Sequence, residues 1–97
     1  MKALQKMQVE MARVQEELER ETVEASVGGG AVRVVMTGDL KVKAVKIDAA
    51  IVDRDDIAML EDMIGAAANE ALRMAQDLAN TKMAKVTGSM GLPPGLI

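Results

Sequence analysis

The sequence predicts an α+β protein in which a three-stranded antiparallel sheet is flanked by two long helices, in the order α-β-β-β-α. Apolar residues recur every three or four positions near both ends of the chain, as in amphipathic helices. Between these segments apolar and polar residues alternate, and glycines divide the alternating stretch into short strands. The chain has 97 residues and neither an internal repeat nor a linker, so residues 1–97 should form a single small domain.

The first predicted helix covers about residues 2–21. Its apolar residues follow one another at spacings of three and four and therefore share one face of the helix. They are Leu4, Met7, Met11, Val14 and Leu18. At about 1.5 Å per residue, this helix should be about 30 Å long.

Three short strands are predicted within about residues 22–48. They cover residues 22–27, 31–37 and 40–47. The run Gly28-Gly29-Gly30 is predicted to be a hairpin connection between the first two, and Gly38-Asp39 is predicted to turn the chain into the third. In the third strand the alternation slips by one residue, which predicts a β-bulge near Ala44-Val45.

The second helix is predicted over about residues 54–86, a length of about 45 Å. Asp53 is the expected N-cap, with Asp55 and Asp56 in the first turn, where carboxylates interact favourably with the helix dipole. The apolar residues step by four and three along the helix and are Leu60, Ile64, Ala67, Ala71, Met74 and Leu78. Residues 87–97 are rich in Gly and Pro and are expected to form a tail without helix.

Composition limits the size of the core. The chain has no Phe, Tyr or Trp, each of which would bury about 150–250 Å². We therefore expect a homodimer, in which a second copy completes the core. No apolar run reaches the roughly 18–20 residues that span a membrane, and the N-terminus is typical of a helix and not of a signal peptide. A cytoplasmic protein is therefore expected.

The residue types also argue against several functions. There is no His, Cys or Tyr, so the usual general bases and activators of a nucleophile are missing, and neither enzyme activity nor a cofactor is expected. The acidic residues after position 52 lack the spacing of a calcium loop, and no metal site is expected. The glycine run leads into a strand and is not followed by Gly-Lys-Ser/Thr, unlike the phosphate loop of a nucleotide-binding protein.

Charge is segregated along the chain although the net charge is only −3. Lys2, Lys6 and Arg13 lie four and seven residues apart and therefore on one face of the first helix. This helix carries lysines at its positive end and glutamates at its negative end, so its charges oppose its own dipole. A local rule broken in this way indicates a function. The alternative is a solvated face on which Lys6 and Arg13 pair with the glutamates four residues on.

The predicted topology brings basic residues of both helices to one end of the molecule. The first helix runs into the sheet and the second runs out of it, so the start of one and the end of the other both lie away from the sheet. If the helices lie side by side, the lysines of the first should approach those of the second at a common tip. These lysines are Lys2, Lys6, Lys82 and Lys85.

Three segments carry a resemblance that covers nearly the whole chain. They are Gly28-Gly29-Gly30 ahead of a Val-rich strand, Val42-Lys43-Ala44-Val45-Lys46-Ile47-Asp48 after it, and the ending Lys82-Met83-Ala84-Lys85-Val86-Thr87-Gly88-Ser89-Met90-Gly91-Leu92-Pro93-Pro94-Gly95-Leu96. In this order they resemble the YbaB/EbfC family of bacterial nucleoid-associated proteins. Members of that family often carry a Gly-rich segment ahead of the first helix, and in this sequence the helix pattern starts at once.

The resemblance implies both an assembly and a function. Members of the family form tweezers-shaped homodimers, bind duplex DNA and associate with the nucleoid, with DNA contacts on the long helices. Applied to this chain, it implies that the two helices are the arms and that the strands at 31–47 lie in the dimer core. The implied DNA-binding residues are Lys2, Lys6, Arg13, Lys82 and Lys85.

Two functions remain open at this point. The first is non-enzymatic binding of duplex DNA through basic arm tips with little sequence preference, which the inverted charge of the first helix favours. Without aromatic residues the chain has no base-stacking platform, which argues against single-strand binding. The second is a protein-interaction accessory of recombination or replication machinery. Net acidity and the apolar segment Met90-Gly91-Leu92-Pro93-Pro94 favour that function.

Overall fold

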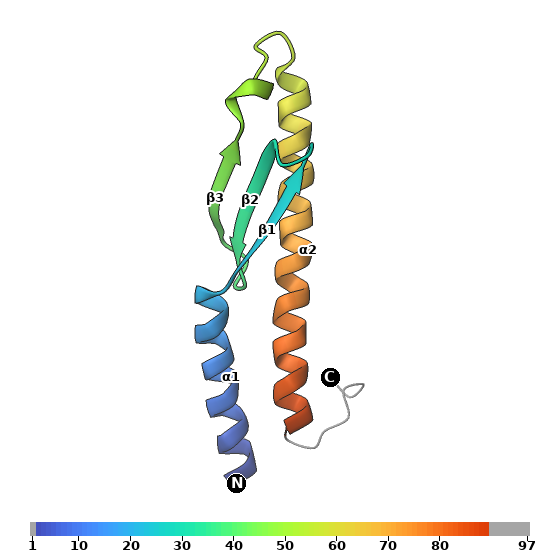
Figure 1. Cartoon of the computed structure of the whole chain (residues 1–97). Coiled ribbons are helices and arrows are strands. Elements are labelled where there is room, and N and C mark those ends of the chain that lie inside the picture. The colour runs from blue at the N-terminus through green and yellow to red at the C-terminus, as the bar shows by residue number, and fades with distance from the viewer. Residues whose placement is uncertain (1, 90–97) are drawn as a thin grey trace.

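The computed structural model describes residues 2–89 and confirms the predicted α-β-β-β-α order (Figure 1). The elements are α1 (Lys2–Arg20), β1 (Thr22–Val27), β2 (Val32–Thr37), β3 (Val42–Ile47), a short 3-10 helix η1 (Ala49–Ile51), and α2 (Ile57–Ser89). The molecule is elongated, at 63 × 23 × 17 Å, because α2 is much longer than the strands beside it.

The strands pair in sequence order, β1-β2-β3, and both pairs are antiparallel. The β1–β2 hairpin closes at the pair Val27 and Val32. Between them, Gly28, Gly29 and Gly30 have positive φ angles of 63°, 67° and 93°. Glycine adopts such angles at little steric cost, so this run is the hairpin connection that the sequence predicts.

A β-bulge interrupts the pairing of β2 with β3. Val35 pairs with Ala44, and the next residue of β2 pairs with Val42. Lys43 is therefore the extra residue of β3. The predicted bulge near Ala44-Val45 is therefore confirmed, and the extra residue comes directly before this pair because the slip in the alternation becomes visible only after it.

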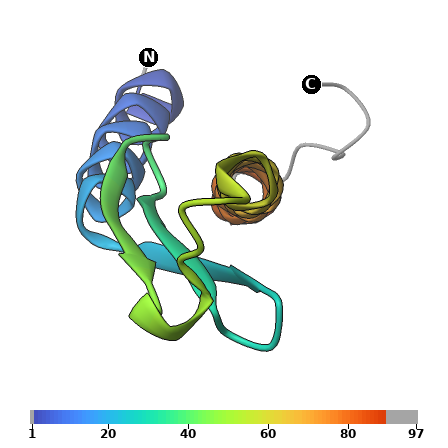
Figure 2. The ribbon, with the colours of Figure 1, turned by 90° about the horizontal axis from the view of Figure 1, so that it is seen from above.

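The main core lies between α2 and one face of the sheet, which we call the inner face (Figure 2). Three residues of α2 are fully buried there, and they are Ala67, Ala71 and Ala75. The buried residues opposite them are Ala25 of β1 and Val32, Val34 and Met36 of β2. Because the alanine side chain is small, α2 lies close to the strands, and a core without aromatic residues can still pack densely.

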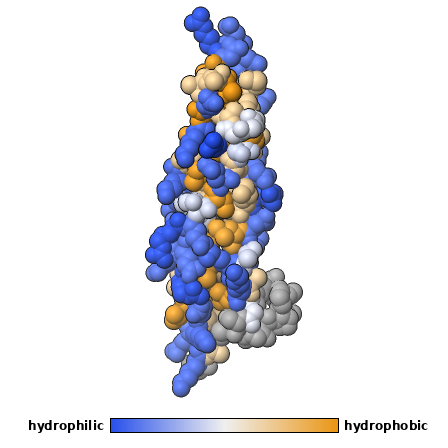
Figure 3. Space-filling model, in the orientation of Figure 1, coloured by the Kyte–Doolittle hydropathy of each residue, from blue (hydrophilic) through white to orange (hydrophobic). Residues whose placement is uncertain are grey.

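β3 lies largely outside the cover of α2, which packs on β1 and β2. The inner-face residues of β3 are Val42, Val45 and Ile47, and they are 56%, 48% and 39% exposed. In Figure 3, hydrophobic side chains remain visible along the middle of the molecule, between hydrophilic margins. The protomer therefore leaves apolar surface uncovered next to its core.

α1 packs against the C-terminal half of α2, and the two helices run antiparallel (Figure 1). Their contact is a small cluster of three buried residues, Val14, Leu18 and Val86, flanked by Leu78, Ala79 and Met83. The first half of the apolar stripe of α1 contributes less, because Leu4 and Met11 are 58% and 37% exposed.

α2 begins three residues later than predicted. Its N-cap is Asp56, which accepts the N–H of Met59 at 3.2 Å. Asp53, the expected cap, instead closes the preceding turn by accepting the N–H of Asp55 at 2.9 Å. Several aspartates in this segment could cap a helix, and the path of the connection from η1 decides which one does so.

The C-terminal end of α2 also differs from the prediction. The helix continues through Gly88 to Ser89, past the predicted end at residue 86. A single glycine costs a helix only about 1 kcal/mol relative to alanine and does not by itself end it. The rest of the predicted tail, residues 90–97, lies outside the described residues.

Gly38 lies in the turn between β2 and β3 and contacts the C-terminal end of α1. It is buried, and its N–H donates to the carbonyl of Glu21 at 2.9 Å. A Cβ at this position would lie 3.0 Å from the carbonyl oxygen of Leu18. The turn continues through Leu40, whose φ of 68° is left-handed, so β3 starts at Val42 and not at residue 40 as predicted.

Replacing Gly38 by alanine should destabilise the protein, because the backbone of Leu18 cannot move aside without shifting α1. We expect a loss of about 1–3 kcal/mol in the free energy of unfolding, measured by urea denaturation. Gly65→Ala is the matched control. Apart from its chain neighbours and the backbone of α2, nothing in the described residues lies within 4 Å of the added Cβ, and helix propensity should raise stability by about 0.5–1 kcal/mol. Wild-type stability of Gly38→Ala would contradict this packing.

Candidate nucleic-acid interface

Lys2 and Lys6 lie in the first two turns of α1 and are exposed. The first turn of α1 contains no acidic residue, and within residues 2–89 neither lysine forms an ion pair. Their charges add to the positive end of the helix dipole, which is unfavourable for the isolated protein. The same arrangement is favourable for an anion that approaches this end of the helix.

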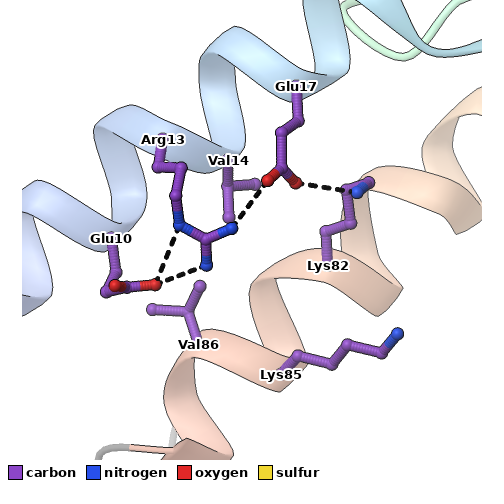
Figure 4. A pocket seen from close by; sticks show the side chains of 7 residues that line it. All are labelled: Glu10, Arg13, Val14, Glu17, Lys82, Lys85 and Val86. Carbon is purple, nitrogen blue, oxygen red and sulfur yellow. Dashed lines mark hydrogen bonds and ion pairs between the residues drawn. The ribbon is translucent and has the colours of Figure 1, made fainter.

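Arg13 is held by two carboxylates of its own helix. Its Nη2 lies 2.5 Å from Oε2 of Glu10, and its Nη1 lies 2.6 Å from Oε1 of Glu17 (Figure 4). These contacts raise the pKa of Arg13, with the hydrogen bond to Glu10 as the main cause. Glu10, expected to pair with Lys6, thus pairs with Arg13. The Arg13 side chain remains 55% exposed, but its charge is locally balanced.

Lys82 of α2 forms ion pairs with the C-terminal end of α1. Its Nζ lies 2.9 Å from Oε2 of Glu17 and 2.8 Å from Oε2 of Glu21, and its side chain is only 18% exposed. Hydrogen bonds to Glu21 and then to Glu17 raise the pKa of Lys82, and Lys82 is the main cause of a lowered pKa at Glu17. Lys82 therefore compensates glutamates that are unfavourable at the negative end of α1.

Lys85 lies beside a hollow of about 400 Å³ between the two helices. The residues around this hollow are Glu10, Arg13, Val14, Glu17, Lys82, Lys85 and Val86 (Figure 4). Lys85 is exposed, and it has no ion-pair partner in the part of the chain that the structure describes. Its ammonium group, like those of Lys2 and Lys6, is therefore available to an anion from solution.

The predicted common tip of four lysines is wrong. Lys82 contacts Glu17 and Glu21, near the sheet, about 22 Å along the axis of α1 from Lys2. Because Val86 packs against Val14, α1 continues roughly 13 Å beyond the end of α2 at about 1.5 Å per residue. Among residues 2–89, the first two turns of α1 thus project beyond α2, and the lysines of α2 lie further towards the sheet.

Two other features are absent from the described residues. Residues 2–89 contain no group of three or more acidic side chains placed to bind a metal ion. No helix within the same residues combines the length and the hydropathy needed to cross a membrane.

A model of the YbaB/EbfC DNA-binding family matches residues 1–90. The chain belongs to this family. Curated relatives agree with the assignment. A nucleoid-associated protein of Acetivibrio thermocellus is 54% identical over 98% of this chain and 84% of its own length. A nucleoid-associated protein of Ruminiclostridium cellulolyticum is 50% identical over 99% of this chain and 84% of its own length. The resemblance noted in the sequence is therefore confirmed.

A solved structure also shares the YbaB/EbfC fold seen here. The crystal structure of an uncharacterized protein from Helicobacter pylori superposes with a TM-score of 0.71 and covers 80% of this chain and 82% of that one. The two sequences are 19% identical, so this likeness concerns the fold alone.

The ion pairs between the helices should make stability depend on pH below neutrality. The pKa of Glu17 is lowered, so its contribution is present above its ordinary value of 4.5 and is lost as pH falls through the lower, folded value. Glu17→Gln should therefore melt at a lower temperature than wild type at pH 7, and the difference should shrink below pH 4.5. Glu19→Gln, which removes an exposed carboxylate of the same helix that forms no ion pair within residues 2–89, is the control and should not melt below wild type at pH 7. A difference for Glu17→Gln that does not depend on pH would contradict the ion-pair account.

Proposed function

We propose that this YbaB/EbfC protein is a non-enzymatic homodimer that binds duplex DNA in the nucleoid, in the cytoplasm. The arms would be α1 and the C-terminal half of α2. The observation that carries the proposal is the projection of Lys2 and Lys6 beyond the end of α2, at the positive end of a helix without acidic residues in its first turn. The family assignment and the names of the relatives support DNA as the ligand.

The five candidate residues differ in how readily they would meet a phosphate. Lys2, Lys6 and Lys85 have exposed ammonium groups without ion-pair partners among the described residues. Arg13 and Lys82 already bind carboxylates, so a phosphate would have to share or replace those partners. We therefore assign the primary contacts to the three lysines and the secondary contacts to the other two.

Binding through these lysines should show little preference for DNA sequence. Lysine ammonium groups bind phosphate oxygens as point charges, and phosphate contacts position a protein on DNA without reading its bases. The chain has no aromatic residue that could stack on an unpaired base, which favours duplex over single-stranded DNA.

The homodimer would use the uncovered inner face of β3. Val42, Val45 and Ile47 are on the same face as the buried residues of β2 but lie beside α2 and not beneath it. β3 is also an edge strand, so half of its backbone groups lack a strand partner within the sheet. A second copy that covers this face would extend a core that contains no aromatic residue.

The second candidate function is a protein-interaction accessory of recombination or replication machinery. A specific observation favours it. Leu4 and Met11, seven residues apart on the apolar stripe of α1, are 58% and 37% exposed, and a contiguous exposed apolar surface marks a protein-interaction site. The DNA test below distinguishes the two functions.

DNA affinity should fall steeply with salt. If four to six phosphates are neutralised per dimer, a plot of log K against log salt should have a slope of about −4 to −5. Replacing Lys2 and Lys6 together by glutamine should weaken binding to every duplex alike and reduce the slope by about 0.9 per lost contact. Fluorescence anisotropy with duplexes of different sequence measures both quantities.

The control variant also loses two positive charges, but from another part of the protein. Arg54→Gln with Arg73→Gln changes two cations in the loop before α2 and on α2 beside Glu70 and Asp77, away from the projecting end of α1. This control should bind nearly as wild type does. Thermal stability of the Lys2/Lys6 variant should be equal or slightly higher, because cations leave the positive end of α1. If the lysine variant binds normally while the control loses affinity, the arm proposal is wrong and the protein-interaction function is favoured.

The dimer proposal predicts a particle of twice 10.3 kDa by light scattering at low micromolar concentration. The melting temperature should also rise with protein concentration, as in any dimer that unfolds to separate chains. Val45→Glu, which places a charge on the inner face of β3, should yield a monomer or an unfolded chain. Ser26→Glu places the same charge on the opposite face of the sheet and should remain dimeric. A cooperatively folded wild-type monomer would refute this interface.

A further inference from the structure

The outer face of the sheet, opposite to the inner face, carries a pair of adjacent cations. Arg33 of β2 and Lys46 of β3 are register partners. They alternate with inner-face residues such as Val32 and Val45, so both side chains leave the sheet on its outer face. Directly opposed residues have Cβ atoms about 4.5–5.5 Å apart, and both of these residues are exposed. The strand register therefore holds two like charges side by side.

Neither cation is balanced by a carboxylate within residues 2–89. The Nε of Arg33 donates to the carbonyl of Gly30 at 3.2 Å, and neither Arg33 nor Lys46 forms an ion pair in the described part of the chain. Asp48 lies beside the two cations but forms no ion pair with either in the described part of the chain, and its Oδ1 accepts the N–H of Ala50 at 2.9 Å. The bond to Gly30 orients the guanidinium and leaves its two Nη groups for another acceptor.

The surroundings make this pair a receptor for an anion. Like charges directly opposite each other destabilise a sheet, and a bound anion removes that repulsion. On the other side of Arg33, the partner on β1 is the neutral Ser26. Arg33 and Lys46 line a hollow of about 250 Å³ together with Gly30, Ile47 and Asp48. Lys43, the bulged residue of β3, is a further exposed cation of the same strand, three residues before Lys46.

We propose that Arg33 and Lys46 form a phosphate-binding site on the outer face of the sheet, separate from the arms. The guanidinium matches two oxygens of one phosphate, and the ammonium group supplies a second charge without a fixed geometry. The site uses side chains and not the amides of the glycine run, so it differs from a nucleotide-binding phosphate loop. A phosphodiester backbone or a free polyphosphate presents the same chemistry to these two side chains.

The position of this site separates it from the arms. Arg33 pairs with Ser26 of β1, and the chain between Lys6 and Ser26 runs along α1 and then β1. At about 1.5 Å per helix residue and 3.3 Å per strand residue, this path is roughly 35 Å long. No single phosphate can contact both places. A duplex bound here would therefore meet a second surface of the protein, and this use of the site rests on the DNA-binding function proposed above.

The test uses the full chain with two probes, a duplex DNA of about 30 base pairs and inorganic tripolyphosphate. Arg33→Gln with Lys46→Gln removes the site, and Arg54→Gln with Arg73→Gln is the charge-matched control. Duplex affinity, measured by anisotropy, should fall about eightfold per lost contact at 0.1 M salt. The plot of log K against log salt should become less steep by about 0.9 per lost contact. Tripolyphosphate should shift the backbone amide NMR signals of Gly30, Arg33 and Lys46 in the wild type and in the control only. The melting temperature of the site variant should be unchanged or slightly higher, because a like-charge pair is removed.

The outcomes separate this site from the proposed function. A loss in either assay, relative to the control, supports the site, and the assay that responds identifies the source of the phosphate. If the wild type does not bind duplex DNA, the proposed function fails while the tripolyphosphate titration still decides on the site. If the Arg33/Lys46 variant matches the control with both probes, the site does not exist.

Discussion

The length of α2 relative to the sheet determines the rest of the architecture. α2 has 33 residues, about 50 Å, whereas strands of six residues span about 20 Å. Its first half packs on β1 and β2 through buried alanines, and its second half runs past the sheet. α1 enters β1 almost directly, so it lies along that second half in the opposite direction. The elongated shape and the paired arms follow from this difference in length, whereas the inner face of β3 is uncovered because α2 packs on β1 and β2.

The inverted charge of α1 has two parts with different physical explanations. Glu17 and Glu21, at the negative end, are compensated by Lys82 of the neighbouring helix, so they help to hold the two helices together. Lys2 and Lys6, at the positive end, have no such partner among the described residues. A solvated face with ion pairs along the helix therefore accounts for Arg13, and it does not account for the two lysines.

Local features of this fold could be predicted from the sequence, and long-range ones could not. The two helices, the three strands and the glycine hairpin follow from periodicity and from residues with special backbone angles, which are properties of neighbouring residues. The partners of Lys82 depend on the axial register of two helices far apart in the chain. That register is set by the contact of Val14 with Val86, and the apolar stripes alone permit several registers because every turn offers an apolar residue. The pairing of Arg33 with Lys46 likewise depends on strand register.

A net charge of −3 does not prevent such a protein from binding a polyanion, because the distances between its charged regions exceed the range of electrostatic interaction. At physiological ionic strength the Debye length is about 8 Å. The aspartates before α2 lie at the opposite end of a 63 Å molecule from Lys2, so their field at that lysine is screened. Glu10 and Glu17 lie in contact with Arg13, so they weaken its attraction for a phosphate much more than the distant aspartates weaken that of Lys2. At about 0.01 M salt the Debye length is about 30 Å, and the acidic end begins to oppose DNA at the arms. As the salt concentration is lowered towards this value, DNA affinity should therefore rise less steeply than counterion release alone predicts.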